Sequence, residues 1–481
     1  MARARSEAGA DRMRHGRTLI RVMASLGAVI LLVIIGARRP SSVEAAPRLT
    51  ADSLTFTADV APILYHNCVM CHRPGGIAPF SMLDFDTVTG RLKDMADVLR
   101  EGKMPPWQAV APAGTFRNER HISDADKHTI LRWIAEGGRF GNPAQLPPAP
   151  TFAADWDIGV PDAIVTMPEE FHVPARGTIE YMYFEAPTNF TEDKWVQAIE
   201  IKPGARDVVH HVLVFARPPD PPAPNASPKG SAAPGVTPAG APSSAAPSSP
   251  PKPVLVFDAA NKIDDTPRKD SLHAPPQRIG TLIGTTAPGT NVITFPEGTA
   301  LRIRAGSILT FQMHYTAKGH DRMDRSSVGF RFAKEMPSEQ IIATHFVNGQ
   351  FSLMPGAKDI MVPSSVAFNE PVKIYGIFPH THLRGKKWQY TLVKPDGSSD
   401  VILDVPKYDF NWQTYYLFAK PLEIPAGARI VARAWYDNSA DNDNNPDPTA
   451  TVRWGDQTWE EMQYTGILYS VNSRRLKPAT K

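Results

Sequence analysis

Cysteine is almost absent from this sequence, because its 481 residues include only two, Cys68 and Cys71. A chain with a single close pair cannot form a framework of several disulfide bonds, so its folded regions must be held together by packing. The pair is therefore available for chemistry, either as a redox centre or in binding a metal or a cofactor.

A strong excess of charge of one sign is also missing. The formal net charge is +3, and residues 1–46 alone carry eight Arg against three acidic residues. The rest of the chain is left with about −2, so it offers no basic surface for a phosphate backbone. Nucleic acid is therefore not an expected partner.

Long apolar runs are confined to residues 22–37 (VMASLGAVILLVIIGA), which follow Arg12, Arg14, Arg17 and Arg21. The run is shorter than the roughly 20 residues of a transmembrane helix, and Val43-Glu44-Ala45 is typical of the end of a cleavage site. We interpret residues 1–50 as an export signal and expect a periplasmic or other extracytoplasmic location. The alternative is an uncleaved membrane anchor through residues 22–37.

The two cysteines form the pattern Cys-x-x-Cys-His with His72. Two thiols one helical turn apart can reach the two vinyl groups of one porphyrin, and the adjoining imidazole can bind the iron. A thioredoxin-like redox pair would not need His72, and a zinc site would need a second cysteine pair. The motif therefore predicts one covalently attached c-type haem.

The other axial ligand of this haem is predicted to be Met104, in the segment Gly-Lys-Met-Pro-Pro-Trp. A thioether ligand raises the haem potential, as an electron carrier requires. Met82 and Met95 are competitors, but Met95 falls within an amphipathic helical pattern and is assigned to the core. His66 and His121 are assigned to the surface.

Helical patterns surround this motif. A short one is capped by Thr57 and runs into the motif, a second runs roughly over residues 86–100, and a third begins at Ser123, has Asp126 in a capping-box position and stops at Gly137-Gly138. Three short helices around a haem are what the c-type cytochrome family shows, and residues 51–150 resemble that family.

Beyond residue 150 the pattern changes to short alternating apolar and polar runs separated by Pro and Gly, which are typical of strands in all-β sandwiches. The clearest runs are 178–184, 195–201, 208–216, 301–315, 372–378, 388–393 and 430–436. Residues 218–253 are nearly all Pro, Ala, Ser and Gly, which predicts a disordered insertion.

Histidines gather in three of these β segments. His380 and His382 lie two positions apart, so on a strand both imidazoles point to one face and can chelate one metal. The neighbours His210 and His211 would face opposite sides, and both can bind one metal only at a strand end or a bulge. A lone strand histidine such as His314 is more often a hydrogen-bonded structural residue.

In sequence order, the His-His pair, the His-Tyr strand, the His-Thr-His strand and a late Glu-Met pair resemble the copper ligands of the type II copper, ascorbate-dependent monooxygenases. This family includes the peptidylglycine α-hydroxylating and dopamine β-monooxygenases. The resemblance spans roughly residues 155–475 and implies two jelly-roll-like sandwiches with one copper each.

The resemblance also implies the role of each ligand. It assigns the electron-transfer copper to His210, His211 and His314, and the oxygen-binding copper, the catalytic one, to His380, His382 and Met462. Imidazole suits both copper oxidation states and a thioether favours Cu(I). Zinc at His380 and His382 is the alternative, and the methionine argues against it.

One departure from the family concerns the substrate. Peptidylglycine hydroxylases place an Arg two residues before the His-x-His pair to hold a carboxylate, whereas this sequence has Phe378. Tyr464 and Gly466 stand where further polar residues are expected after the ligand Met. A peptide carboxylate is therefore not predicted as the recognised group.

Together these observations predict a multidomain fold, with a small all-α cytochrome c domain followed by two all-β jelly-roll-like sandwiches. The predicted domains are a signal or anchor (1–50), a haem domain (51–150) and two copper-binding sandwiches (151–340 and 341–481). We expect O2-dependent hydroxylation of an unidentified small molecule, with electrons entering from a periplasmic donor through the haem. A non-catalytic electron-transfer or copper-binding protein and an adhesion or scaffold module are the alternatives.

Overall fold

The computed structural model describes residues 53–152, 155–219, 253–262, 279–286, 292–474 and 476. The predicted export signal, including residues 22–37, and most of the predicted insertion at 218–253 lie outside the described residues. From Leu54 onward the chain forms one compact unit. Within the described ranges, no helix combines the length and the apolar character needed to cross a bilayer.

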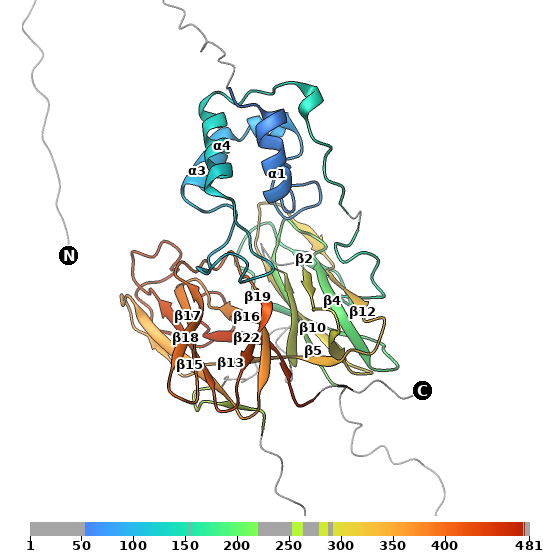
Figure 1. Cartoon of the computed structure of the whole chain (residues 1–481). Coiled ribbons are helices and arrows are strands. Elements are labelled where there is room, and N and C mark those ends of the chain that lie inside the picture. Colours follow the sequence, from blue (N-terminus) through green and yellow to red (C-terminus); the bar gives the residue numbers. More distant parts are fainter. Residues whose placement is uncertain are drawn as a thin grey trace, which may run out of the picture. The chain divides into compact units, whose positions relative to one another are not determined.

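The helices lie in the first hundred described residues and are short (Figure 1). They are η1 (Phe56–Val60), α1 (Ala61–Asn67), α2 (Phe85–Thr89), α3 (Leu92–Arg100), α4 (Asp124–Ala135) and η2 (Pro143–Gln145). The hydroxyl of Ser123 accepts a hydrogen bond from the backbone N–H of Asp126 at 3.0 Å, which confirms the predicted start of α4. The helix predicted over 86–100 is two helices, because α2 ends at Thr89, with Gly90 as its C-cap, and α3 begins at Leu92.

These helices share a small apolar core that includes Phe56, Leu64 and Trp133. Met82 and Met95 are also buried in it, with 7% and 3% of their surfaces exposed. The core position predicted for Met95 is therefore confirmed, and Met82 is buried beside it.

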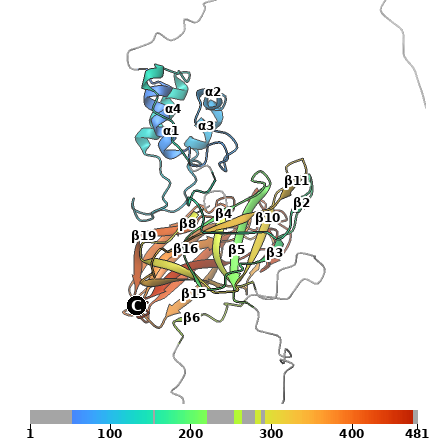
Figure 2. The ribbon, with the colours of Figure 1, turned by 90° about the vertical axis from the view of Figure 1, so that its right-hand side faces the viewer.

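The remainder is built from β-strands in three larger sheets (Figures 1 and 2). The nine-stranded sheet has the order β1 (Ala163–Thr166), β12 (Ser327–Phe332), β4 (Lys194–Lys202), β9 (Thr299–Ile303), β13 (Glu339–Val347), β22 (Tyr464–Val471), β16 (Val372–His380) and β19 (Tyr416–Ile424), with β8 (Val292–Thr294) paired to β4. The four-stranded sheet has the order β3 (Met182–Pro187), β10 (Ile308–Tyr315), β5 (Val209–Arg217) and β7 (Thr281–Thr286).

The five-stranded sheet has the order β18 (Ser399–Val405), β17 (Gly385–Val393), β20 (Arg429–Tyr436), β15 (Ile360–Phe368) and β6 (Leu255–Phe257). Two small pairs complete the described strands: β2 (Phe171–Val173) with β11 (Arg322–Asp324), and β14 (Ser352–Leu353) with β21 (Val452–Arg453). The run predicted as one strand over 301–315 is divided into β9 and β10 by a turn at Gly306, whose φ of 68° favours glycine.

Two apolar cores lie along the nine-stranded sheet. One includes side chains of β5 and β10 from the four-stranded sheet together with β4 and β12, and the other includes side chains of β17 and β20 from the five-stranded sheet together with β13 and β22. Strand β20 alternates as predicted, whereas β10 and β16 are almost wholly buried and all eight residues of β22 are buried. A central strand covered on both faces loses the alternation that the sequence rule relies on.

The predicted fold class is wrong. The described chain is mostly β-sheet with few short helices, and no separate all-α domain divides Leu54 from the strands that follow. The two predicted sandwiches are also not independent, because β9 and β13 pair in parallel and carry one sheet through both cores.

The segment after α3 shows why the helical part is not a unit of its own. Its backbone hydrogen bonds run to the β region, from Arg117 N to the Leu417 carbonyl and from Ala419 N to the Thr115 carbonyl, both at 2.9 Å. Phe116 pairs with Phe418 across a β-bridge. The segment therefore covers the open edge of β19, which would otherwise expose unpaired backbone groups.

Asn118 contributes the side-chain contacts of this edge, donating to the Tyr415 carbonyl at 2.7 Å and accepting from Leu417 N at 3.0 Å. We predict that Asn118→Ala lowers the free energy of unfolding by about 1–3 kcal/mol, because both bonds are lost in a half-buried place. Urea denaturation measures this, with Asn444→Ala at an exposed side chain as the control. Equal stability of the two variants would show that the edge contact is not stabilising.

Candidate metal centre

His210, His211 and His314 come from the paired strands β5 and β10. His314 lies opposite His211, and the next partners are Tyr315 and Val209, so His210 is an extra residue in a bulge. A bulge turns a neighbouring side chain out of strict alternation. Both members of the His-His pair therefore face His314, as the sequence required if they were to share one metal.

The ring nitrogens of these three histidines converge. The Nδ1 atom of His211 lies 3.1 Å from Nδ1 of His210 and 3.3 Å from Nδ1 of His314. One potential ligand atom from each residue falls within 4.8 Å of the others. Two imidazole nitrogens bound to one ion at about 2.0–2.1 Å are about 3.3–3.5 Å apart, so the cluster has the dimensions of a metal site.

Two of the three rings are oriented by hydrogen bonds at the opposite nitrogen. Nε2 of His210 donates to the side-chain oxygen of Asn411 at 3.3 Å, which leaves Nδ1 unprotonated and facing the cluster. Nε2 of His314 lies 3.4 Å from the hydroxyl of Thr458. Nε2 of His211 is buried without a partner. Outer hydrogen bonds of this kind fix the tautomer of metal-binding histidines.

His380 and His382 form a second group at the end of β16, with ring centroids 5.2 Å apart. Here Nδ1 is the outer nitrogen: it donates to the Gln413 side-chain oxygen from His380 at 2.9 Å and to the Glu460 carbonyl from His382 at 3.1 Å. Nε2 of His382 is buried with no hydrogen-bond partner. An orphaned nitrogen in a dry interior is costly unless it binds a ligand, so the residues fit a metal.

Glu461 holds the backbone around this second group. Its fully buried carboxylate accepts hydrogen bonds from the backbone N–H groups of His382, Arg384 and Met462 at 2.8, 2.6 and 3.2 Å. Burial raises the pKa of Glu461 to about 7, against the effect of these donors. One carboxylate thereby ties the chain at Met462 to the chain at His382.

The two histidine groups share neighbours. The ring of Tyr181 lies 5.6 Å from His211 and 6.2 Å from His382, measured between centroids. The ring of Phe410 lies 5.9 Å from His211 and 6.0 Å from His382. We call the five histidines with these shared neighbours the histidine centre, because both groups line one interior region.

Burial keeps the centre uncharged. It lowers the pKa of His314 to about 3, with further contributions from His210 and His380, and it lowers the pKa of His380 to about 4. The pKa values of His211 and His382 are lowered well below the usual range for the same reason. Neutral imidazoles carry the free lone pair that a metal requires.

Phe378, which stands where the peptidylglycine hydroxylases have an Arg, packs against the second histidine group. The Phe378 ring is fully buried and stacks on His380, with centroids 6.0 Å apart and planes 13° apart. On its other side it stacks on Tyr415 at 5.3 Å. A buried aromatic ring in this place packs against the His380 imidazole and offers no cation for a carboxylate.

Cys68, Cys71 and His72 follow α1. Nδ1 of His72 donates to the Phe80 carbonyl at 3.1 Å, so Nε2 carries the free lone pair. Both cysteines are free thiols, and burial raises the pKa of Cys68 to about 12. A reactive redox thiol has a lowered pKa, so this direction disfavours a thioredoxin-like pair. Met104 lies after α3, half-buried and outside the helical core.

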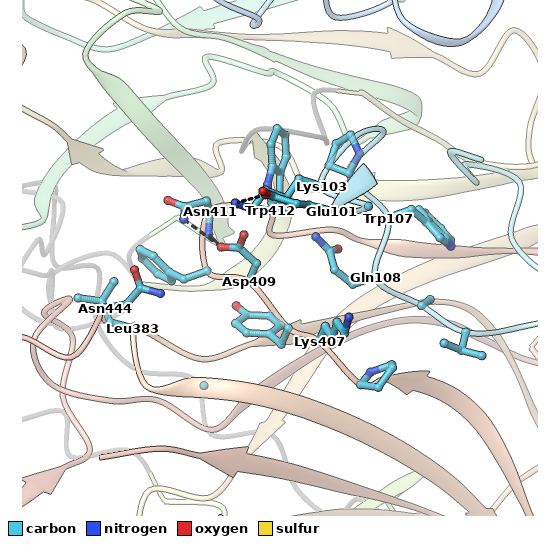
Figure 3. Close-up of a pocket in the computed structure, with 18 of the residues that line it drawn as sticks. Glu101, Lys103, Trp107, Gln108, Leu383, Lys407, Asp409, Asn411, Trp412 and Asn444 are labelled. Carbon is cyan, nitrogen blue, oxygen red and sulfur yellow. Dashed lines mark hydrogen bonds and ion pairs between the residues drawn. The ribbon is translucent and has the colours of Figure 1, made fainter. Parts of the chain in front are cut away.

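A cavity of about 620 Å³ adjoins the histidine centre (Figure 3). The segment after α3 contributes Trp107 and Gln108, and the loop before β19 contributes Tyr408, Phe410 and Asn411. Phe410 stacks on His210, with centroids 5.5 Å apart, and Asn411 is the partner of the same ring. Two residues of the cavity wall, Phe410 and Asn411, therefore contact the His210 ring directly.

Residues 361–475 match the family model "Copper type II ascorbate-dependent monooxygenase, C-terminal domain". The matched range includes His380, His382 and Met462. The predicted resemblance is thus confirmed for this part of the chain, and it points to a copper-dependent oxygenase. The match does not extend to the Cys-x-x-Cys-His segment.

Solved structures add no closer relationship. The chain is similar to the major capsid protein P2 of bacteriophage PM2, with 8% identity and a TM-score of 0.25, over 66% of this chain and 99% of that one. A fucolectin from striped bass serum has 8% identity and a TM-score of 0.13, over 63% and 85% of the two chains. No curated protein matches the sequence.

Three residues around the centre were not found by sequence reasoning. Gln413 and Asn411 lie in a loop without a recognisable motif, and their roles depend on contacts with residues some 200 positions earlier. Glu461 was noticed only as part of the Glu-Met pair. Its position next to the predicted ligand Met462 was the available signal.

The lowered pKa values predict how the metal-free protein responds to acid. Between about pH 6.5 and pH 4 the unfolded chain binds protons at these histidines and the folded chain does not, so stability falls as pH falls. We expect a loss of up to about 1.4 kcal/mol per pH unit for each such histidine. Chemical denaturation from pH 7 to pH 5 measures it.

His380→Gln should make this pH dependence shallower, whereas His128→Gln, on an exposed part of α4, should leave it unchanged. The same slope in His380→Gln as in the wild type would contradict the neutral, buried state of His380.

Proposed function

We propose that this chain is a copper-dependent monooxygenase that hydroxylates a C–H bond of a small organic molecule. The overall reaction consumes one O2, two electrons and two protons per C–H bond, and yields one hydroxyl group and one water. The observation that carries the proposal is the buried convergence of five neutral histidines, two of which lie within the segment that matches the copper monooxygenase family.

His210, His211 and His314 would hold one copper through Nδ1, and His380, His382 and Met462 would hold the other, with Nε2 of both histidines. Bound copper would supply one-electron chemistry and the activation of O2. The chain contributes the donor set, in which soft sulfur favours Cu(I), and a centre closed by Phe410 and Phe378.

The substrate would approach through the cavity beside His210. Its walls combine the rings of Trp107 and Tyr408 with the side-chain amides of Gln108 and Asn411. The charged residues Glu101, Lys103, Lys407 and Asp409 also line the cavity, so its walls suit a small molecule that has both an apolar part and polar groups. With Phe378 in place of a cation, a peptide carboxylate has no counterpart at His380.

We also propose that electrons enter through a haem attached to Cys68 and Cys71, with His72 and Met104 as axial ligands. The support is the Cys-x-x-Cys-His pattern, the free lone pair on His72 Nε2 and the uncharged thiols. In the vicinity of Cys71, a buried guanidinium nitrogen of Arg120 has no partner, and a haem carboxylate would satisfy it. Such a haem fits the extracytoplasmic location predicted from residues 1–50.

The copper sites are separable by substitution. His314→Ala should reduce copper from two to one per chain, because it removes an imidazole, a ligand that binds both copper oxidation states strongly. Met462→Ile removes only a weaker thioether and keeps both imidazoles of its site, so it should retain two coppers but should slow the oxidation of the reduced protein by O2. Copper analysis and the growth of the Cu(II) electron paramagnetic resonance (EPR) signal after mixing with O2 measure both effects.

Met354→Ile, at an exposed methionine, is the matched control and should behave as the wild type. One copper in the wild type would favour a non-catalytic carrier, and none would favour a scaffold. Wild-type copper content and oxidation rate in both variants would make these residues ordinary members of a β core.

The haem is tested independently of copper. Denatured wild-type protein should retain the haem through its thioether bonds, and Cys68→Ala with Cys71→Ala should lose it. Met104→His should lower the reduction potential, because imidazole in place of thioether favours the ferric state. Haem staining after denaturing electrophoresis and redox titration are the measurements. Full haem retention by the double variant would refute the attachment.

A further inference from the structure

The side-chain amide of Gln413 contacts one histidine from each group, His380 and His211. It is fully buried, in the loop just before β19. Its side-chain oxygen lies 2.9 Å from Nδ1 of His380, and its side-chain nitrogen lies 3.5 Å from Nδ1 of His211. The amide is therefore placed between the two proposed copper sites.

The orientation of this amide is determined by a third contact. The side-chain nitrogen donates to the Phe410 carbonyl at 3.3 Å, so the nitrogen must point that way and the oxygen must face His380. An amide oxygen can only accept, so Nδ1 of His380 carries the proton and Nε2 carries the lone pair. Gln413 thus selects the tautomer in which His380 can bind a metal through Nε2.

The same amide faces the centre of the other group. Nδ1 of His211 is the nitrogen nearest to both His210 and His314, and the N–H of Gln413 points toward it with a long contact. A metal on this Nδ1 uses the lone pair that the amide faces. The side-chain nitrogen of Gln413 then keeps only the Phe410 carbonyl as its acceptor. Any movement of the amide changes the hydrogen bond between its oxygen and Nδ1 of His380.

We propose that Gln413 is a positioning residue that couples the two copper sites, so that copper at the three-histidine site changes the copper affinity at His380, His382 and Met462. This inference rests on the proposed copper function. Because coupling between two binding sites is reciprocal, copper at the second site changes the affinity of the first by the same factor.

Two substitutions separate the parts of the proposal. Gln413→Leu removes both contacts while filling a similar volume, and it should lower Cu(I) affinity at the His380 site by about 10–100-fold, as loss of an outer hydrogen bond does elsewhere. Gln413→Glu keeps an oxygen acceptor for His380 but removes the N–H that faces His211. It should restore the affinity at the His380 site without restoring the coupling.

The coupling is measured by adding His314→Ala, which disables the three-histidine site. In the Gln413 chain this change should alter Cu(I) affinity at the remaining site, measured by competition with a chromogenic Cu(I) chelator. In the Gln413→Leu and Gln413→Glu chains it should leave that affinity unchanged. The Cu(II) EPR spectrum of the remaining site should follow the same pattern.

Gln389→Leu is the matched control, since Gln389 bonds to Asp404 on β18 and contacts no histidine of the centre. Wild-type affinities, spectra and coupling in Gln413→Leu would overturn this inference while two bound coppers kept the proposed function intact. A wild-type protein that binds no copper would instead overturn the proposed function itself. Loss of folding in Gln413→Leu is recognised by its thermal transition, and Gln413→Glu then supplies the test.

Discussion

The burial of five imidazoles in one apolar region is the constraint on which the surrounding structure depends. A buried imidazole that carried a second proton, and with it a positive charge, would be strongly destabilised, so the protein must keep each ring neutral. Asn411, Thr458, Gln413 and the Glu460 carbonyl contact the outer nitrogens of His210, His314, His380 and His382. The inner nitrogens of His210, His211 and His314 face one another.

This division of nitrogens differs between the two groups. The bulged strand β5 presents Nδ1 atoms inward, whereas the rings at the end of β16 are held by Nδ1 and present Nε2. The bulge in β5, the loop with Asn411 and Gln413, and the Glu461 carboxylate together hold the histidines in place. These three features come from parts of the chain that lie far apart in the sequence.

Sequence reasoning picked out the histidines that the structure brings together, but not the residues that orient them. The spacing of His380 and His382 and the condition placed on His210 and His211 follow from strand geometry, and the bulge meets that condition. Capping at Ser123 is equally local and was predicted correctly. The fold class failed because it depended on long-range pairing: the parallel contact of β9 with β13, and the segment at Phe116 on the edge of β19, leave no local pattern.

The shared nine-stranded sheet has a mechanical consequence. Proteins assembled from two domains on a linker can open and close around a substrate, but a sheet whose hydrogen bonds pass from one core to the other has no hinge. The spacing of the two histidine groups is then set by strand register, as in a rigid frame. Access to the centre would then depend on side chains and loops at the cavity, and the two histidine groups would keep one separation whether the cavity is filled or empty.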